Sequence, residues 1–302
     1  PFLEALILYW EHFPLHPDMP QNDTFVALMD LSIEGAATML ERPETLVEGT
    51  FFDLFGRAFK AMYWADNGKT AKAAGDLRIK YKRTREGFDL VDDFSDFYFS
   101  TGLYNYYIEA YREAHPIYKP LVAFMQEGDR KKGLDLLARA MDECVYLQVE
   151  SRLFMTLIQL NYEDDLEQAS LLGSALLDDF PKNRYYQGLA LTIWLHQGAL
   201  GKIGDLLAAM RQQKDLYSLL VRDLGQAFLA EREGMEVDAR LGYTHAIDKA
   251  GTIGKMADTF KAMAYMGLSR LSESNGDDSE AKMYRRKAKS FTPYLFILEA
   301  SW

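Results

Sequence analysis

The chain has 302 residues, of which 48% are hydrophobic, 13% aromatic and 26% charged. This composition supplies a core and argues against disorder. The formal net charge of −11 repels phosphate backbones, so no nucleic-acid partner is expected. The single cysteine, Cys144, excludes an internal disulfide and a cysteine metal cage, and we interpret it as a small buried hydrophobe.

No run of about 18 apolar residues occurs, so no membrane span is predicted and we expect a soluble protein. The chain begins at Pro1 instead of Met. This start suggests that an upstream segment was removed. The compartment is left open between cytoplasmic and, if that segment was an export signal, periplasmic. The densest group of cations that we recognise is Lys80, Lys82, Arg83 and Arg85, at the end of a predicted helix, where cations complement the helix dipole.

Proline placement and hydrophobic spacing predict an all-α protein. Three closely spaced prolines before residue 21 block a long helix there. Apolar residues then recur at helical spacing over 23–40, 44–65 and about 92–114. Residues 51–85 form one divergent repeat, in which Gly68 is followed five places on by Ala73. The region 1–114 is therefore predicted to be helical and to precede a more regular array.

Five segments of the following region, 115–293, repeat one pattern. A turn residue is followed five places on by a small or aliphatic residue and seven places later by another. The triplets are Gly128/Gly133/Ala140, Asp164/Ala169/Leu176, Gly198/Ile203/Met210, Gly234/Ala239/Ala246 and Gly276/Ala281/Ala288. Their middle members lie 36, 34, 36 and 42 residues apart, and the last step predicts longer helices or an insertion near residues 250–255. This period is typical of helix-turn-helix units that must stack to bury their apolar faces.

The spacing resembles that of the tetratricopeptide repeat, which also places a proline five residues after the last landmark, as Pro293 does here. The resemblance implies an α-solenoid, a right-handed superhelix of stacked antiparallel helix pairs in one continuous body. It also implies a non-catalytic scaffold that binds a peptide or helix of another protein in a concave groove. The first helices of the units keep the family pattern poorly, so their register is less secure.

The resemblance places the groove on the first helix of each unit. The positions carried over to this chain are His115, Tyr118, Gln126, Phe154, Tyr162, Tyr185, His196, Phe228, Arg232 and Arg270. They predict a mixed aromatic and polar groove, not a basic one.

The segment 94–118 is the most aromatic part of the chain. Tyr104 and Tyr111 lie seven residues apart and share a helix face, and Tyr107 lies between them. Such a stripe is typical of a core, but tyrosine also tolerates half-wet sites and is enriched at interfaces. These three tyrosines are therefore either packed, part of the partner-binding surface, or the wall of a small-ligand pocket.

Asp92, Asp93 and Asp96 match the Asp-Asp-x-x-Asp motif of isoprenoid synthases, which would make the chain a Mg²⁺-dependent enzyme. The second Asp-rich motif of those enzymes is missing, and we favour helix capping as the explanation of the aspartates. The five histidines show no metal spacing, and no nucleophile elbow occurs. We therefore predict no catalytic residues, no metal and no cofactor, with the synthase and the small-ligand binder as alternatives.

The chain ends in an apolar tail, residues 294–302. The end of a helical array exposes a face that needs a cover. We expect the tail to cover this face, and the alternative is a homo-oligomer in which the tail docks into another subunit.

Overall fold

All regular secondary structure in the described part of the chain is helical, which confirms the all-α prediction for those residues. The computed structural model describes residues 1–17, 19–75, 77–114 and 125–299, with the backbone alone for 77, 78 and 111–114. Packing divides the chain into two compact units. Pro1–Tyr9 and Pro20–Ile158 form the first unit, and Trp10–Met19 and Gln159–Trp302 form the second.

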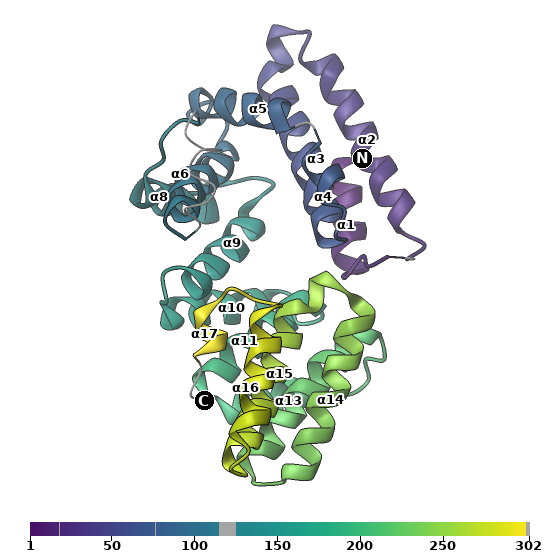
Figure 1. Cartoon of the computed structure of the whole chain (residues 1–302). Helices are drawn as coiled ribbons and strands as arrows, with labels where there is room; N and C mark the ends of the chain where they lie inside the picture. Colours follow the sequence, from purple (N-terminus) through teal and green to yellow (C-terminus); the bar gives the residue numbers. More distant parts are fainter. Residues whose placement is uncertain (18, 76, 115–124, 300–302) are drawn as a thin grey trace. The chain divides into compact units, whose positions relative to one another are not determined.

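The first unit contains packed helix pairs, such as α2 with α3 (Figure 1). Its helices are α1 (Phe2–Glu11), α2 (Asn22–Met39), the 3-10 helix η1 (Pro43–Thr45), α3 (Leu46–Asp66), α4 (Thr70–Ala73), α5 (Leu77–Asp89), α6 (Phe97–Ala114), α8 (Arg130–Glu143) and α9 (Gln148–Asn161). The chain passes into the second unit near the end of α9.

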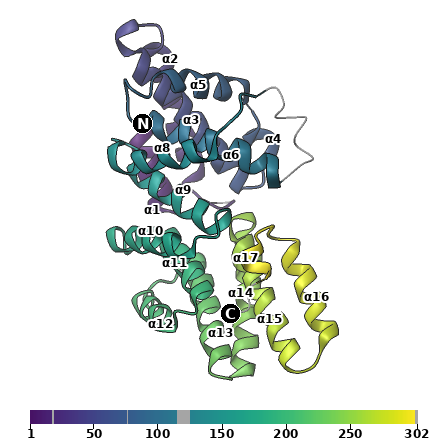
Figure 2. The same cartoon turned by 90° about the vertical axis from the view of Figure 1, so that its left-hand side faces the viewer.

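The second unit is a succession of helices in which α13, α14, α15 and α16 lie side by side (Figures 1 and 2). Its helices are α10 (Leu166–Asp179), α11 (Arg184–Gln197), α12 (Leu200–Ala209), α13 (Leu216–Arg232), α14 (Glu236–Ile253), the 3-10 helix η3 (Lys255–Ala257), α15 (Asp258–Ser274), α16 (Asp278–Lys289) and α17 (Leu295–Leu298). Helix α11 also packs on α13, and α13 on α15.

The small residues of the five-and-seven pattern lie where helices meet. All ten landmarks after the turn residues are buried. They are Gly133, Ala140, Ala169, Leu176, Ile203, Met210, Ala239, Ala246, Ala281 and Ala288. Seven of the ten are glycine or alanine, whose short side chains let two helix backbones approach closely.

The turn residues of four of the five segments adopt the left-handed conformation, with φ of 53° at Asp164, 64° at Gly198, 73° at Gly234 and 76° at Gly276. Glycine adopts this conformation without a steric penalty. Gly128 does not share it: a Cβ atom there would lie 2.2 Å from Ile108 Cγ2 and 2.4 Å from the carbonyl oxygen of Asn105. Gly128 is therefore required for a close approach to α6.

The long step before Ala281 has the predicted origin. Helix α14 has 18 residues, against 14 in α10, and Gly254 then turns the chain into η3 before α15 begins. The additional residues therefore lengthen one helix and add a short connection near residues 250–255.

Two helices in the first unit differ from their predicted ranges. Helix α6 begins at Phe97, because the residues from Leu90 to Asp96 form turns. The helix expected after Gly68 is divided into the single turn of α4 and the longer α5.

Candidate functional site

Asp96 anchors the start of α9. Its carboxylate is completely buried and accepts three backbone N–H hydrogen bonds, from Val145 at 2.8 Å and from Tyr146 and Leu147 at 2.9 Å each. Charge-assisted bonds of this kind stabilise a helix N-terminus. Asp96 therefore has the capping role considered for the aspartates, but the helix that it caps is α9, which is distant in sequence.

The other two aspartates of the motif do not converge with Asp96. Asp92 and Asp93 are exposed residues of a turn. A synthase would need the three carboxylates on one face, open to a cation. Among the described residues, no three His, Cys, Asp or Glu side chains are placed to hold a metal ion.

Cys144 lies beside Asp96 and is buried, with its thiol directed at the carbonyl oxygen of Ser95 at 3.4 Å. Burial, followed by the negative charge of Asp96, raises the pKa of the Cys144 thiol to about 12. Because the thiolate is the reactive form, this thiol is a poor nucleophile near neutral pH.

The N-terminal segment of the second unit covers one predicted groove residue. Tyr185, at the start of α11, is half-buried, and its ring meets the rings of Phe13 at 4.9 Å and Trp10 at 5.8 Å. Arg184 adds hydrogen bonds from its guanidinium to the carbonyl oxygens of Glu11 and Phe13. Tyr185 is therefore in contact with the chain's own N-terminal segment.

The apolar tail covers two further groove residues. Phe296 lies 5.3 Å from the ring of His196, and Tyr294 lies 6.4 Å from that of Tyr162. Ile297, a residue of the tail, is completely buried. The described part of the tail thus packs on its own unit, as expected for a cover.

The groove residues on α13 have different surroundings. Phe228 is completely buried, so it is a core residue and does not present its ring to a partner. Arg232 is exposed and places its guanidinium 4.9 Å from the centre of the Phe228 ring.

In the first unit, two predicted residues border an apolar pocket. Tyr104 and Phe154 line it together with Phe55, Phe59, Phe99 and Leu103. Its volume is about 390 Å³. The Tyr104 hydroxyl donates to the carbonyl oxygen of Gln126 at 2.6 Å, which places the backbone of a third predicted residue beside it.

Tyr107 is not among the described residues that line this pocket. Tyr107 is half-buried and meets the ring of Tyr106 at 5.4 Å. The predictions for His115 and Tyr118, and for the side chain of Tyr111, fall outside the described residues.

The last predicted residue, Arg270, borders a larger pocket in the second unit, between α15, α16 and α17. The pocket has a volume of about 640 Å³. It is lined by Met266, Arg270 and Glu273 of α15, Lys282, Arg285, Arg286 and Lys289 of α16, and Leu298 and Glu299 of the tail. We call these nine residues the basic cradle, because five of them are cations and two are anions.

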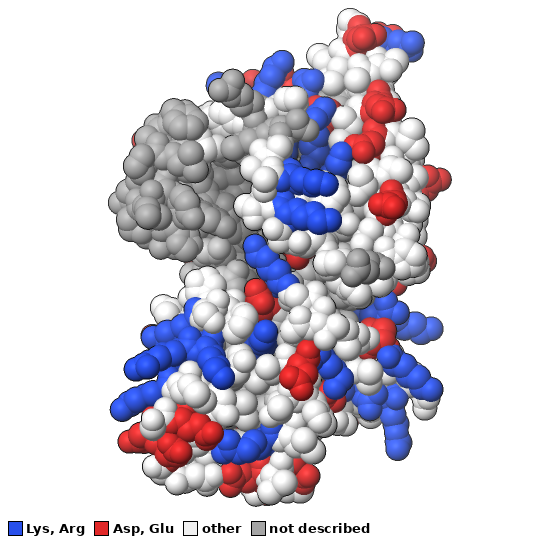
Figure 3. Space-filling view, turned by 45° about the vertical axis from the view of Figure 1, so that its right-hand side comes forward, with Lys and Arg blue, Asp and Glu red and all other residues white. Residues whose placement is uncertain are grey.

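Two of the five cations have acidic partners. Arg270 donates to both carboxylate oxygens of Glu231, at 2.7 and 2.8 Å, and Arg285 pairs with Glu273 at 2.5 Å. Lys282, Arg286 and Lys289 are exposed and have no ion pair within the described residues. Lys and Arg side chains gather in groups, with acidic side chains beside them, on the face of the molecule in Figure 3.

Buried hydrogen bonds between three helices hold the side chain of Arg270 in position. Tyr243 of α14 donates its hydroxyl hydrogen to Glu231 of α13 and also lies 3.3 Å from Arg270. Burial raises the pKa of the Tyr243 hydroxyl, which keeps this donor protonated. Gly267 makes room for the ring, because a Cβ atom there would lie 2.2 Å from Tyr243 Cζ.

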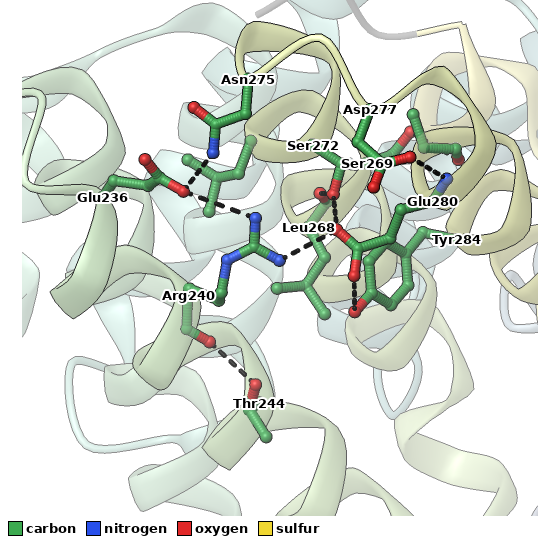
Figure 4. A network of polar contacts seen from close by, with 12 residues as sticks. Glu236, Arg240, Thr244, Leu268, Ser269, Ser272, Asn275, Asp277, Glu280 and Tyr284 are labelled. Atoms are coloured by element: carbon green, nitrogen blue, oxygen red, sulfur yellow. Dashed lines mark hydrogen bonds and ion pairs between the residues drawn. The ribbon is translucent and has the colours of Figure 1, made fainter.

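The α16 wall of the cradle is fixed by a second polar network (Figure 4). Glu280 of α16 accepts from Ser272 of α15 at 2.6 Å and from Arg240 of α14 at 3.3 Å. The hydrogen bond from Ser272, followed by the charge of Arg240, lowers the pKa of the Glu280 carboxyl. Glu280 is therefore ionised near neutral pH and joins the three helices.

Sequence reasoning missed four of the five cations of the cradle. Lys282, Arg285, Arg286 and Lys289 recur at the i, i+3, i+4 and i+7 spacing of one helix face, whereas the cluster selected from the sequence was Lys80–Arg85. In the latter, Arg83 pairs with Asp53 and Glu86, and Lys82 with Glu86. The expected groove was not basic, whereas the pocket around Arg270 is.

The sequence matches no known protein-family model, and neither a curated protein nor a solved structure is significantly similar to it. No helix of the described residues has the length and apolar character needed to cross a bilayer.

Proposed function

We propose that this chain is a non-catalytic binding protein whose second unit receives a segment of another protein on a tetratricopeptide-like array of helix pairs. The successive contacts of α11, α13 and α15 support this proposal, because these are the first helices of consecutive predicted units. In such an array the first helices line the binding face.

The observation that carries the proposal is the position of the basic cradle. It is an open pocket between α15, the last of these first helices, α16 and the tail, whereas the rings of Tyr185 and His196 on α11 are in contact with rings of the chain's own terminal segments. A pocket of about 640 Å³ accommodates several side chains of a bound segment. The alternative of a synthase lacks support, because the oxygens of Asp96 bind backbone amides.

Site-specific photo-crosslinking tests the proposal. A benzophenone amino acid replaces Leu298, which lines the cradle, and in a control replaces Leu295, which is 63% exposed on the same short helix and does not line it. In an extract of the native cells, we expect a protein adduct from position 298 that is absent from position 295. Equal labelling from both positions, or none from 298, contradicts the proposal.

The apolar pocket of the first unit supports a second candidate function, the binding of a small apolar ligand. The hydroxyls of Thr84 and Ser100 in its wall donate to the backbone carbonyls of Lys80 and Phe97. The wall therefore suits a ligand that needs few hydrogen bonds.

Filling this pocket tests the second candidate. Ala58→Phe places a ring in the pocket, and Ala208→Phe, at an exposed position of α12, is the control. Fluorescence of an anilinonaphthalene sulfonate dye should fall in the first variant and persist in the control. Unchanged dye binding in a folded Ala58→Phe protein contradicts it.

A further inference from the structure

We propose that the basic cradle recognises an acidic segment that carries an apolar side chain among its carboxylates. The inference rests on the proposed function and names the chemistry of the partner. Three observations carry it: the charge of the cradle, the spacing of its cations and its apolar floor.

The charge of the cradle is opposite to that of the whole chain. The chain has a formal net charge of −11, yet five of the nine cradle residues are cations. Glu231 and Glu273 compensate Arg270 and Arg285, which leaves Lys282, Arg286 and Lys289 exposed without an ion pair among the described residues. Complementary carboxylates would be attracted to this place, although the net charge of the chain is negative.

The cations of α16 define the reach of the partner. Lys282 and Lys289 are seven residues apart on one helix face, which corresponds to about 10 Å along the axis, with Arg286 between them. Helix-dipole stabilisation accounts for cations in the last turn of α16, but Lys282 lies in its first half. A short segment with two or three carboxylates therefore matches this row.

The cradle also has an apolar part. Met266 is only 3% exposed at its floor, and Leu298 borders it from the tail. A leucine-sized side chain would bury its surface here, which adds affinity that does not depend on charge. Methionine adapts its shape to such contacts.

A nucleic acid fits the cradle less well than an acidic peptide. Duplex DNA carries one charge in about every 1.7 Å, so binding by charge requires an extended basic surface. Here Glu273 and Glu299 border the same pocket. Local carboxylates can avoid these two groups, whereas a continuous phosphate backbone cannot.

Fluorescence anisotropy with defined peptides tests the inference on the purified full chain. The probe is a labelled peptide of about twelve residues, a length that exceeds the cation row, built from repeats of two glutamates and one leucine. A matched peptide has glutamine in place of glutamate. We expect the glutamate peptide to bind at low salt, to weaken as salt screens the charges, and to bind at least about tenfold more tightly than its glutamine counterpart.

The matched protein variants separate the cradle from net charge. Lys282→Gln, Arg286→Gln and Lys289→Gln together should weaken glutamate-peptide binding about tenfold. Lys131→Gln, Lys182→Gln and Lys214→Gln remove the same charge from exposed positions elsewhere and should change it less than about twofold. Circular dichroism establishes that both triple variants are folded.

Equal loss in both triple variants, equal binding of the two peptides, or tighter binding of a duplex DNA would each overturn the inference. The Leu298 crosslink distinguishes the two proposals. An adduct that persists in the cradle triple variant supports the proposed function while the acidic inference fails. If the crosslinker at position 298 gives no adduct in the protein that keeps all five cradle cations, the proposed function itself fails.

Discussion

In the first unit, α6 and α8 cross at two glycines, whereas in the second unit the landmarks of α14 and α16 are alanines. A Cβ atom on Gly133 would lie 2.7 Å from the backbone nitrogen of Tyr106 and 2.9 Å from the carbonyl oxygen of Gly102. Ala239, Ala246, Ala281 and Ala288 are buried and keep their methyl groups. The same sequence spacing thus serves two interhelical distances, and the residue at each landmark reports which one applies.

The two units also differ in how their cores are completed. Around Phe51, the first unit has a cluster of rings from separate elements, including Phe2 at 5.7 Å and Phe94 at 5.3 Å. The second unit relies on successive packed helix pairs, such as α13 with α14 and α15 with α16. The apolar pocket lies in the first unit, and the basic cradle lies in the second.

The largest effect is expected at the glycine crossing. Gly133→Ala should destabilise the first unit by about 3 kcal/mol, because the new methyl group meets backbone atoms that cannot move independently. Gly204→Ala in α12 is the control: nothing lies within 4 Å of the added methyl group, and it should stabilise by up to about 1 kcal/mol. Urea unfolding followed by circular dichroism measures the stability of both variants. Labelling of Cys144 reports separately on the first unit. A loss at Gly133 below about 0.5 kcal/mol would show that α6 and α8 are not in close contact.

A smaller loss, in the second unit, is expected from Glu231→Gln. The side chains of Arg270 and Glu231 are only 16% and 11% exposed, so the substitution leaves a largely buried guanidinium without its carboxylate. We expect a cost of about 2 kcal/mol. Exposed Glu233→Gln should cost less than about 0.5 kcal/mol. Because Cys144 belongs to the first unit, its labelling reports whether Glu231→Gln acts on the second unit alone.

Asp96→Asn tests the capping of α9. The amide side chain retains one acceptor oxygen where the carboxylate uses both, so about 1.5 kcal/mol should be lost. Asp93→Asn, at an exposed turn position of the same motif, should have no measurable effect. Urea unfolding compares the two variants, and equal losses would contradict the distinct role of Asp96.

The second helices of the repeats were the most predictable part of the fold. Gly234, Ala239 and Ala246 follow one another at steps of five and seven residues, and their constraints arise within one helix-turn-helix unit. The coverage of Tyr185 and His196 was not predictable in the same way. Their neighbours, Phe13 and Phe296, lie about 100 to 170 residues away in sequence, and helical periodicity contains no information on such contacts.

The basic cradle lies between these cases. The row from Lys282 to Lys289 is visible as helical spacing, and the sequence therefore contained its cations. Its meaning as a pocket wall depends on Arg270 of the neighbouring helix and on the position of the tail at Leu298. The role of Gly128 was similarly hidden, since turn and close-approach glycines look identical in sequence.

The smallest expected effect is a pH dependence of stability, which His196 confers on the second unit. Burial lowers the pKa of His196, and the charge of Asp164 only partly opposes this. In the unfolded chain the pKa of a histidine is about 6.5, so His196 binds a proton more readily there than in the folded chain. The stability that neutral His196 contributes is thus complete above the pKa of the unfolded chain. It is lost as the pH falls from there to the lower pKa of His196 in the folded chain. His196→Gln should flatten this part of the stability curve, measured by urea unfolding at a series of pH values. An unchanged slope in His196→Gln would show that the tail contact with Phe296 does not keep His196 buried in solution.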